Sequence, residues 1–258
     1  MDLTSLFGLD GKVVLVTGGS RGIGEMLAHG FVAAGARVYV ASRKPADVAR
    51  VADELTAAGG SCTALPGDLS TPAGVDELAA AVTEREPALH VLVNNAGATW
   101  GAPLGEYPAD GFDKVLDLNV RGLFLLTQAL LPNLEAAASA EDPARVLNIG
   151  SIDGIRVPAF ESYAYSASKA AVHQLTRHLG ATLARRHVTV NAIAPGLFPS
   201  KMTAFLLDHE EEVAATVPRG RLGTPEDIAG TAIYLASRAG AYTTGAVIPV
   251  DGGAATLR

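Results

Sequence analysis

Residues 13–24 read VVLVTGGSRGIG, a β-branched apolar run that breaks into a glycine-rich turn before a helical pattern begins. Glycines in such a turn permit positive φ angles and let the backbone approach a ligand closely. The N–H groups that open the following helix, together with the helix dipole, suit a pyrophosphate. The spacing is G-x-x-x-G-x-G rather than G-x-G-x-x-G. The turn predicts a dinucleotide site that uses Gly18, Ser20, Arg21, Gly22, Ile23 and Gly24.

Outward from this turn, short apolar runs alternate with longer Ala/Leu-rich stretches at helical spacing. Such alternation predicts an α/β fold, in which one doubly wound, Rossmann-like parallel sheet of about seven strands carries helices on both faces. We expect a single domain over residues 1–258. The expected strands are Val13–Val16, Arg37–Ala41, Cys62–Leu65, His90–Val93, Arg145–Ile149, His187–Ile193 and Ala246–Val250, and the expected helices are about 22–34, 46–58, 72–85, 108–137, 162–185 and 225–237.

One irregular region interrupts this pattern at about 196–224, where glycines and prolines flank an apolar cluster and an acidic stretch. Long insertions in compact domains are often functional. The region is therefore either a surface excursion or a substrate lid over about 197–223, and the sequence leaves both interpretations open.

The end of the second expected strand bears on cofactor choice. An NAD enzyme usually carries Asp or Glu there to bind the ribose 2′-hydroxyl. Here the chain reads Ser42-Arg43-Lys44, without a carboxylate. Arg43 and Arg21 are suited to a 2′-phosphate through charge-assisted hydrogen bonds. The sequence favours NADP(H) over NAD(H), with Ser42 and Arg43 in the site.

Tyr165 and Lys169 stand four residues apart on an expected helix and therefore share one face. A cation about 6 Å away stabilises a phenolate and is expected to move the pKa of a tyrosine from ~10 toward ~8. Such a phenol is a general acid/base near neutral pH. Ser151 follows an apolar strand, where its hydroxyl can donate to a carbonyl oxygen.

The glycine turn allows a competing interpretation. Gly18 to Gly22 also match G-x-S-x-G, the nucleophile elbow of serine hydrolases, with Ser20 as nucleophile. This alternative needs an acid and a histidine close by, and it leaves Tyr165 and Lys169 without a role.

Seven motifs follow one another along the chain. They are Thr17-Gly18-x-x-x-Gly22-x-Gly24, Asp68-Leu69, Asn94-Asn95-Ala96-Gly97, Asn119, Ser151, Tyr165-x-x-x-Lys169 and Pro195-Gly196. This set resembles the short-chain dehydrogenase/reductase family over essentially the whole length. The stretches around Ser151, Tyr165 and residues 193–202 resemble most closely the β-ketoacyl reductase branch of the rhamnolipid-pathway type.

The resemblance implies roles for individual residues. Asp68 contacts the adenine, Asn119 holds a water that links Lys169 to solvent, and Lys169 binds the nicotinamide ribose. Ser200 stands where the family often has threonine. The implied catalytic set is Asn119, Ser151, Tyr165 and Lys169, and the implied cofactor contacts also include Leu69, Asn95, Ala96, Gly97, Pro195, Gly196 and Ser200.

The expected function is an NADPH-dependent carbonyl reductase or alcohol dehydrogenase that acts on a 3-oxoacyl or similar ketone, with Tyr165 as general acid/base. A sugar, steroid or small secondary alcohol is an alternative substrate, and a non-catalytic NADP(H)-binding regulator is an alternative of another class. Fold and motif do not determine substrate. Candidate pocket residues, each of which is alternatively a core residue, are Trp100, Asp153, Ile155, Tyr163, Phe198 and Met202.

Composition excludes other classes. The net charge of -7 argues against a nucleic-acid surface. Cys62 is the only cysteine, which precludes an intramolecular disulfide and fits a reducing compartment. The first residues lack the features of a signal peptide, and no apolar run approaches the ~20 residues of a membrane span. The six histidines show no metal-ligand spacing. We expect a cytoplasmic enzyme without a metal, and the resemblance implies a homotetramer or homodimer.

Overall fold

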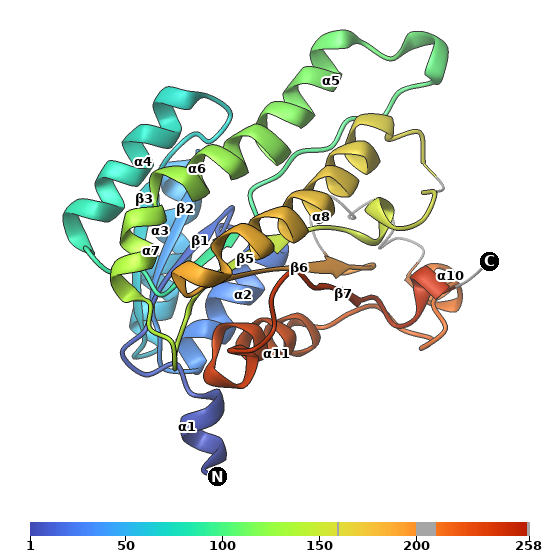
Figure 1. Cartoon of the computed structure of the whole chain (residues 1–258). Helices are drawn as coiled ribbons and strands as arrows, with labels where there is room; N and C mark the ends of the chain where they lie inside the picture. Colours follow the sequence, from blue (N-terminus) through green and yellow to red (C-terminus); the bar gives the residue numbers. More distant parts are fainter. Residues whose placement is uncertain (159, 200–209, 257–258) are drawn as a thin grey trace.

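One seven-stranded parallel sheet forms the centre of the computed structural model, which describes residues 1–158, 160–199 and 210–256 (Figure 1). The strand order is β3-β2-β1-β4-β5-β6-β7. The predicted doubly wound sheet is confirmed, and every strand lies within two residues of its expected bounds. The strands are β1 (Val13–Thr17), β2 (Arg37–Ser42), β3 (Ser61–Pro66), β4 (Val91–Asn94), β5 (Ala144–Ile149), β6 (Val188–Pro195) and β7 (Val247–Val250).

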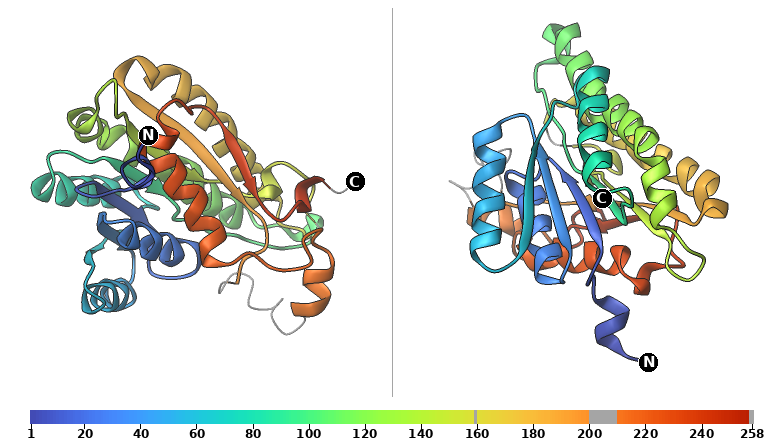
Figure 2. Two further views of the ribbon diagram at one scale, coloured as in Figure 1. Left: turned by 90° about the horizontal axis from the view of Figure 1, so that it is seen from below. Right: turned by 90° about the vertical axis from the view of Figure 1, so that its left-hand side faces the viewer.

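Helices cover both faces of the sheet, as the two views of Figure 2 show. One core cluster joins the sheet to α2 (Gly22–Ala33), α3 (Pro45–Ala57) and α11 (Pro225–Ala236). A second cluster lies against α4 (Pro72–Arg85), α6 (Leu123–Ala129), α7 (Leu131–Ala137) and α8 (Tyr163–Leu183). The central strands β1, β4, β5 and β6 are buried throughout, which explains why most of their residues are apolar.

The single helix expected over 108–137 is wrong. The structure divides it into α5 (Ala109–Leu116), a π-helical turn η2 (Asp117–Gly122), α6 and α7. Pro132 at the start of α7 has no N–H for the helical ladder, which accounts for the break between α6 and α7. π-Helical turns are rare and frequently lie at functional sites. The apolar spacing over 108–137 predicted helix but did not indicate where the helix is interrupted.

Two short helices were not expected from the sequence. Helix α1 (Leu3–Phe7) has only five residues, and the Asp2 side chain caps it by accepting from the N–H groups of Thr4 and Ser5. Helix α10 (Glu210–Ala215) forms part of the irregular region. Single 3-10 turns complete the described chain at η1 (Leu104–Glu106), η3 (Ile152–Gly154), η4 (Ala184–Arg186), η5 (Arg238–Gly240) and η6 (Ala254–Thr256).

None of the helices within the described ranges is by itself long and apolar enough to cross a membrane. The bent pair Ala109–Ala129 and Leu131–Ala137 reaches that threshold by length and composition alone.

From β1 the chain first adds strands on one side of the sheet, β2 and β3, and then crosses to the other side of β1 to add β4. The position between β1 and β4 is therefore a topological switch point. In open parallel sheets the crevice beyond the carboxyl ends of the strands at such a switch point is where ligands bind. Thr17 ends β1 and Asn94 ends β4, so the loops that follow these strands border this crevice.

Candidate active site

The turn between β1 and α2 depends on its glycines. Gly18 and Gly22 have φ angles of 66° and 54°, in the left-handed region that favours glycine. A Cβ atom on Gly24 would lie 2.2 Å from the carbonyl oxygen of Gly18. The sequence therefore folds here into a tight turn whose backbone is open to a ligand, as predicted.

Asn95 and Thr17 fasten this turn to the loop after β4. The Asn95 Nδ2 donates to the carbonyl oxygens of Thr17 and Gly18 at 2.8 and 3.1 Å. The backbone N–H groups of Asn95 and Ala96 both donate to Thr17 Oγ1 at 3.0 Å. These hydrogen bonds brace the two loops against each other. The sequence analysis quoted Thr17 in a motif but gave it no role.

The features around the turn fit the phosphates and adenosine of a dinucleotide. Helix α2 begins directly after Arg21, and in the described part of the chain no side chain caps its first N–H groups. Those groups and the helix dipole favour an anion.

Asp68, the residue expected at the adenine, follows β3. Its Oδ1 accepts hydrogen bonds from the Ser70 N–H and hydroxyl at 3.0 and 2.8 Å. Burial opposes ionisation here, but these bonds and the Arg43 charge keep the pKa of Asp68 below its usual value. Arg43 and Asp68 are thus neighbours, while Ser42 directs its hydroxyl at the Lys44 carbonyl 3.5 Å away. Arg43 lies where a 2′-phosphate site was expected.

The catalytic candidates converge from two elements. Ser151 follows β5, and Tyr165 and Lys169 lie one turn apart on α8. The Ser151 hydroxyl hydrogen-bonds the Tyr165 phenol. The Lys169 Nζ lies 5.5 Å from the centre of the Tyr165 ring and donates to the Ile149 carbonyl at 2.7 Å. The phenol, the hydroxyl and the ammonium group form one cluster, as the spacing predicted.

The prediction of a lowered pKa for Tyr165 is wrong for the chain by itself. Burial raises the pKa of Tyr165 to about 12, the Ser151 hydrogen bond opposes this rise, and the charge of Asp153 adds to it. Burial also lowers the pKa of Lys169 to about 8. The sequence argument counted one charge and omitted desolvation, which is the larger effect in a buried site.

Asn119 ties the loop after β4 to α8. It lies in the π-helical turn and is 2% exposed. Its Oδ1 accepts from the Ala98 N–H at 2.8 Å, and its Nδ2 donates to the Ala98 carbonyl and to Ser168 Oγ at 3.0 and 2.9 Å. Gly97 lies against it, with an added Cβ 3.3 Å from Oδ1. Sequence reasoning missed Ser168, whose hydroxyl also donates to the Tyr165 carbonyl at 2.7 Å. The role of Asn119 in holding a water stays a prediction.

The remaining cofactor candidates lie beside these groups or outside the described residues. Pro195 ends β6, and the Gly196 N–H donates to the Val250 carbonyl at 2.9 Å. A Cβ on Gly196 would lie 2.7 Å from Asp251, so close packing with the end of β7 requires glycine there. Ser200 and Met202 lie outside the described residues. Leu69 is buried in the second core cluster, and Ile23 packs partly buried on the first.

The proposed substrate-pocket residues do not all gather at Tyr165. Phe198 is 3% exposed in the first core cluster, with its ring against Gly223, so its role is packing and its assignment to the pocket is corrected. Trp100 packs on Gly111, with the Lys114 ammonium 5.1 Å from its ring. Ile155 is exposed beside η3.

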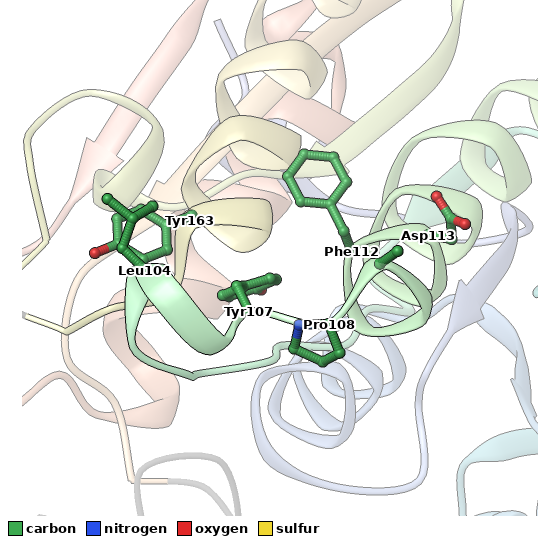
Figure 3. A pocket seen from close by; sticks show the side chains of 7 residues that line it. Leu104, Tyr107, Pro108, Phe112, Asp113 and Tyr163 are labelled. Atoms are coloured by element: carbon green, nitrogen blue, oxygen red, sulfur yellow. The ribbon is translucent and has the colours of Figure 1, made fainter.

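Tyr163 borders a different hollow. This pocket of about 350 Å³ is lined by none of Ser151, Tyr165 or Lys169 (Figure 3). Tyr163 points away from Tyr165 because the two are only two residues apart on α8. Its ring meets that of Tyr107 edge to face at 5.8 Å, and its hydroxyl donates to Glu161 at 3.0 Å. The pocket residues are Leu104, Tyr107, Pro108, Ala109, Phe112, Asp113 and Tyr163.

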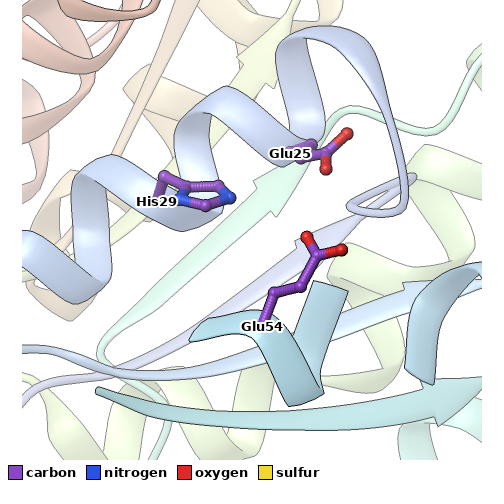
Figure 4. Close-up of side chains that lie close together, drawn as sticks. All are labelled: Glu25, His29 and Glu54. Atoms are coloured by element: carbon purple, nitrogen blue, oxygen red, sulfur yellow. The ribbon is translucent and has the colours of Figure 1, made fainter. Parts of the chain in front are cut away.

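The geometry gives little support to a metal site at α2 and α3 or to a serine-hydrolase triad around Ser20. Glu25, His29 and Glu54 bring possible metal ligands together on α2 and α3 (Figure 4), but Arg50 pairs with both carboxylates at 3.0 and 2.8 Å. The Ser20 carbonyl accepts from Arg50, and across the described residues no histidine bonds the Ser20 hydroxyl. A hydrolytic triad around Ser20 is therefore not formed.

Comparisons with known proteins find relatives that match almost the whole chain. A family profile described as enoyl-(acyl carrier protein) reductase matches residues 18–255. The chain is 51% identical over 250 residues to a rhamnolipids biosynthesis 3-oxoacyl-[acyl-carrier-protein] reductase of Pseudomonas aeruginosa, which covers 96% of this chain and 97% of that protein. It is 38% identical over 258 residues to a galactitol 2-dehydrogenase (L-tagatose-forming) of Cereibacter sphaeroides, with 98% of each covered.

A solved structure described as a Pseudomonas aeruginosa RhlG/NADP active-site complex superposes with a TM-score of 0.94 at 50% identity, covering 97% of this chain and 99% of that chain. The match to the family profile, the relatives and the fold confirm the resemblance seen in the motifs. The chain belongs to the short-chain dehydrogenase/reductase family.

Proposed function

We propose that this chain is an NADPH-dependent reductase of a 3-oxoacyl thioester or similar ketone. The observation that carries the proposal is the Ser151–Tyr165 hydrogen bond above the buried Lys169. The 51% identical relative is named a 3-oxoacyl-[acyl-carrier-protein] reductase, which supports this substrate class.

Each group has a distinct task in this reaction. The Ser151 Oγ accepts a hydrogen bond from the Asp153 N–H at 3.1 Å, and its own single proton is donated to the Tyr165 oxygen. When a substrate carbonyl oxygen lies beside Ser151, the same proton can be donated to that oxygen instead. Tyr165 donates the proton that the reduced oxygen needs. Lys169 stabilises the phenolate that remains. NADPH, when bound, would supply the hydride that a carbonyl reduction needs. The N–H groups of α2, the Asn95 brace and Asp68 would hold that cofactor.

Selection of the phosphorylated cofactor rests on the end of β2. Ser42, Arg43 and Lys44 supply no carboxylate that would repel a 2′-phosphate, and Arg43 lies in the electrostatic reach of Asp68. The solved relative described as an NADP complex supports the same choice.

The test is consumption of NADPH with acetoacetyl thioesters, compared with crotonyl thioesters because the matching family profile is described by enoyl reduction. We expect acetoacetyl reduction and a loss of about 10²–10⁴-fold in kcat/KM for Tyr165→Phe. A Tyr165→Phe variant that keeps most of the wild-type rate would falsify the mechanism. If NADPH is consumed with the crotonyl thioester and not with the acetoacetyl thioester, the proposed ketone substrate is wrong.

A second substrate class has its own support. The galactitol 2-dehydrogenase relative is 38% identical over almost the whole chain, so the same chemistry on a polyol or small secondary alcohol is a specific alternative. Parallel assays of alcohols with NADP⁺ and ketones with NADPH separate the two classes. A protein that binds NADP(H) and turns over no carbonyl or alcohol would instead be a regulator.

We also propose that the chain forms homotetramers. Phe112 and Phe124 are exposed apolar side chains on α5 and α6. A hollow of about 410 Å³ lies there, lined by Leu116, Asp117, Val120, Arg121, Phe124, Ala171 and Leu175. A helical face of this kind suits a second copy of the chain. Light scattering of the purified protein tests the assembly, and a monomeric mass contradicts it.

We propose that the whole chain forms one domain and that the enzyme is cytoplasmic. We also propose that residues 197–223 form a lid over the substrate. The Gly223 N–H donates to the Leu197 carbonyl at 2.9 Å, so the two ends of the segment are joined. Long connecting segments in compact domains are frequently functional. Residues 200–209 lie outside the described part of the chain, and limited proteolysis with and without NADPH and ketone tests the closure.

A further inference from the structure

The two halves of the glycine-rich turn between β1 and α2 are held in different ways. The first half is tied to the sheet, since the Gly18 N–H donates to the Ala41 carbonyl at 2.7 Å. Across the described residues, the Ser20 carbonyl accepts one hydrogen bond, from Arg50 Nη2 at 3.1 Å, and the Arg21 N–H donates to no group. Arg50, on the neighbouring helix α3, is therefore the side chain that fixes the second half of the turn.

The bond to the Ser20 carbonyl also sets the direction of the next N–H group. The Ser20–Arg21 peptide is trans, so its carbonyl and its N–H point to opposite sides of the chain. Because Arg50 holds the Ser20 oxygen, the Arg21 N–H faces away from the Arg50 guanidinium. Arg21 directly precedes α2, and with no acceptor in the described part of the chain its N–H is available to a phosphate oxygen there.

The same guanidinium pairs with a carboxylate beside this phosphate site. Glu25 lies in the first turn of α2, where its negative charge opposes the binding of a further anion. Nη1 and Nη2 of Arg50 each lie 3.0 Å from Glu25 Oε1, and Nη1 also bonds Glu54 Oε2 at 2.8 Å. The two carboxylates reach toward one another from α2 and α3 (Figure 4). Arg50 thus neutralises a charge that would repel the phosphates.

We propose that Arg50 is a positioning residue for the dinucleotide. It holds the Ser20–Arg21 peptide with the N–H available to a phosphate, and it screens that phosphate from the Glu25 charge. Arg50 acts through these groups and does not itself bind the cofactor. The inference rests on the dinucleotide binding of the proposed function and not on the identity of the ketone.

The first test measures the Kd of Arg50→Ala for NADP⁺ and for NAD⁺ by calorimetry, without substrate. Because both dinucleotides carry the pyrophosphate, each Kd should rise about tenfold, and their ratio should stay within about twofold of the wild-type ratio. Unchanged Kd values would overturn the proposal. A loss confined to NADP⁺ would make Arg50 a contact of the 2′-phosphate, which also overturns it.

Two further variants separate the peptide from the charge. In Arg50→Ala/Glu25→Gln the repulsion is gone but the peptide is still unheld, so the Kd for NADP⁺ should recover only to about threefold above the wild-type value. Arg50→Lys keeps a positive charge but loses the planar fork that reaches Ser20 and Glu25 together, so its Kd should lie between those of the wild type and Arg50→Ala. Complete recovery in the double variant would leave the Ser20 bond without effect, and no recovery would leave the Glu25 pair without effect. Either result overturns the proposal.

Glu54→Gln is the matched control. It removes an exposed carboxylate partner of Arg50 on α3 and leaves the bonds to Ser20 and Glu25 in place. Its Kd values for both dinucleotides should stay within about twofold of the wild-type values. An equal loss in Glu54→Gln and Arg50→Ala would show a general effect of charge at α3 and overturn the role of the Ser20 bond.

Hydrogen exchange gives a readout that an ordinary surface ion pair would not change. Saturating NADP⁺ should slow amide exchange over residues 18–24 in the wild type, followed by mass spectrometry, and should slow it less in Arg50→Ala. The urea midpoint of this variant should hardly move, because exposed ion pairs contribute little to stability. Equal slowing in the two proteins would refute the role of Arg50, even if ketone reduction is confirmed. Weaker slowing with a higher Kd but no ketone reduction would support this inference and leave only the substrate wrong.

Discussion

The ammonium group of Lys169 lies 5.5 Å from the centre of the Tyr165 ring, but its hydrogen bond goes to the backbone of β5. The Ile149 carbonyl, 2.7 Å away, holds the cation in place without neutralising it. The charge is therefore positioned for a phenolate that forms during turnover. Because Lys169 is only 5% exposed, this arrangement places a poorly solvated cation inside the fold.

Replacing Lys169 by methionine should separate activity from stability. Burial lowers the pKa of Lys169 from 10.5 to about 8. Between these values the unfolded chain binds more protons than the folded one, so stability rises with pH through this window. Below it, the cation destabilises the fold. We expect Lys169→Met to lose about 10²-fold or more in kcat/KM.

The free energy of unfolding of Lys169→Met near pH 7 should exceed that of the wild type by about 1–2 kcal/mol. This figure is the gain from removing the buried cation minus the loss of its hydrogen bond to the Ile149 carbonyl. Urea unfolding at about pH 7 and about pH 10 measures this, and the gain should shrink at the higher pH. A variant that is less stable than the wild type near neutrality would show that the cation contributes to folding.

Gly150→Ala should displace Ser151, the next residue in the chain. The added Cβ would lie 2.2 Å from Nε2 of His173, which is 3% exposed and has little room to move. Overpacking of this kind costs about 1–3 kcal/mol. We expect that loss in urea unfolding and a lower kcat, since Ser151 is the next residue.

The double variant Gly150→Ala/His173→Ala makes this prediction specific. Removing the imidazole opens the space that the new methyl group needs, so the two effects should be less than additive. Additive losses in the double variant would mean that the contact with His173 is not the cause.

The sequence predicted the parts of this protein that depend on local pattern. Strand bounds followed from apolar runs, and the Tyr165–Lys169 spacing gave about the separation that the structure has. The pKa of Tyr165 was mispredicted because desolvation depends on everything packed around the ring. The π-helical turn at Asn119 was missed because its amide bonds Ala98, far away in sequence.

Asp142→Asn tests a buried ion cluster at the opposite ends of the strands. Asp142 pairs with Lys12 and with Arg145, whose side chain is fully buried. Burial opposes ionisation, but these two cations hold the pKa of Asp142 below its usual value. Its contribution to stability is therefore present above the unfolded pKa of about 3.8 and is lost as pH falls through the folded value.

Removal of this carboxylate leaves Lys12 and the buried Arg145 without an anionic partner, although Arg145 keeps the carbonyl of Ser237. We therefore expect a loss of about 3 kcal/mol in urea unfolding near pH 7. Glu135→Gln is the control, because Glu135 pairs with Arg186 on the surface and should cost less than about 1 kcal/mol. Equal losses in the two variants would contradict the importance of burial at Asp142.

Arg43→Ala should weaken binding of the phosphorylated cofactor selectively. Arg43 follows β2 and lies close enough to Asp68 for its charge to lower the pKa of that carboxyl. A charge-assisted bond contributes about 1.5–3 kcal/mol, which corresponds to about 10–100-fold in Kd for NADP⁺. Calorimetry with NADP⁺ and NAD⁺ in parallel measures this, and the Kd for NAD⁺ should stay almost unchanged. Lys44→Ala is the matched control, because it removes the adjacent charge and should affect NADP⁺ less. Equal weakening of both dinucleotides by Arg43→Ala would place Arg43 at a group that they share, and the assignment to the 2′-phosphate would be wrong.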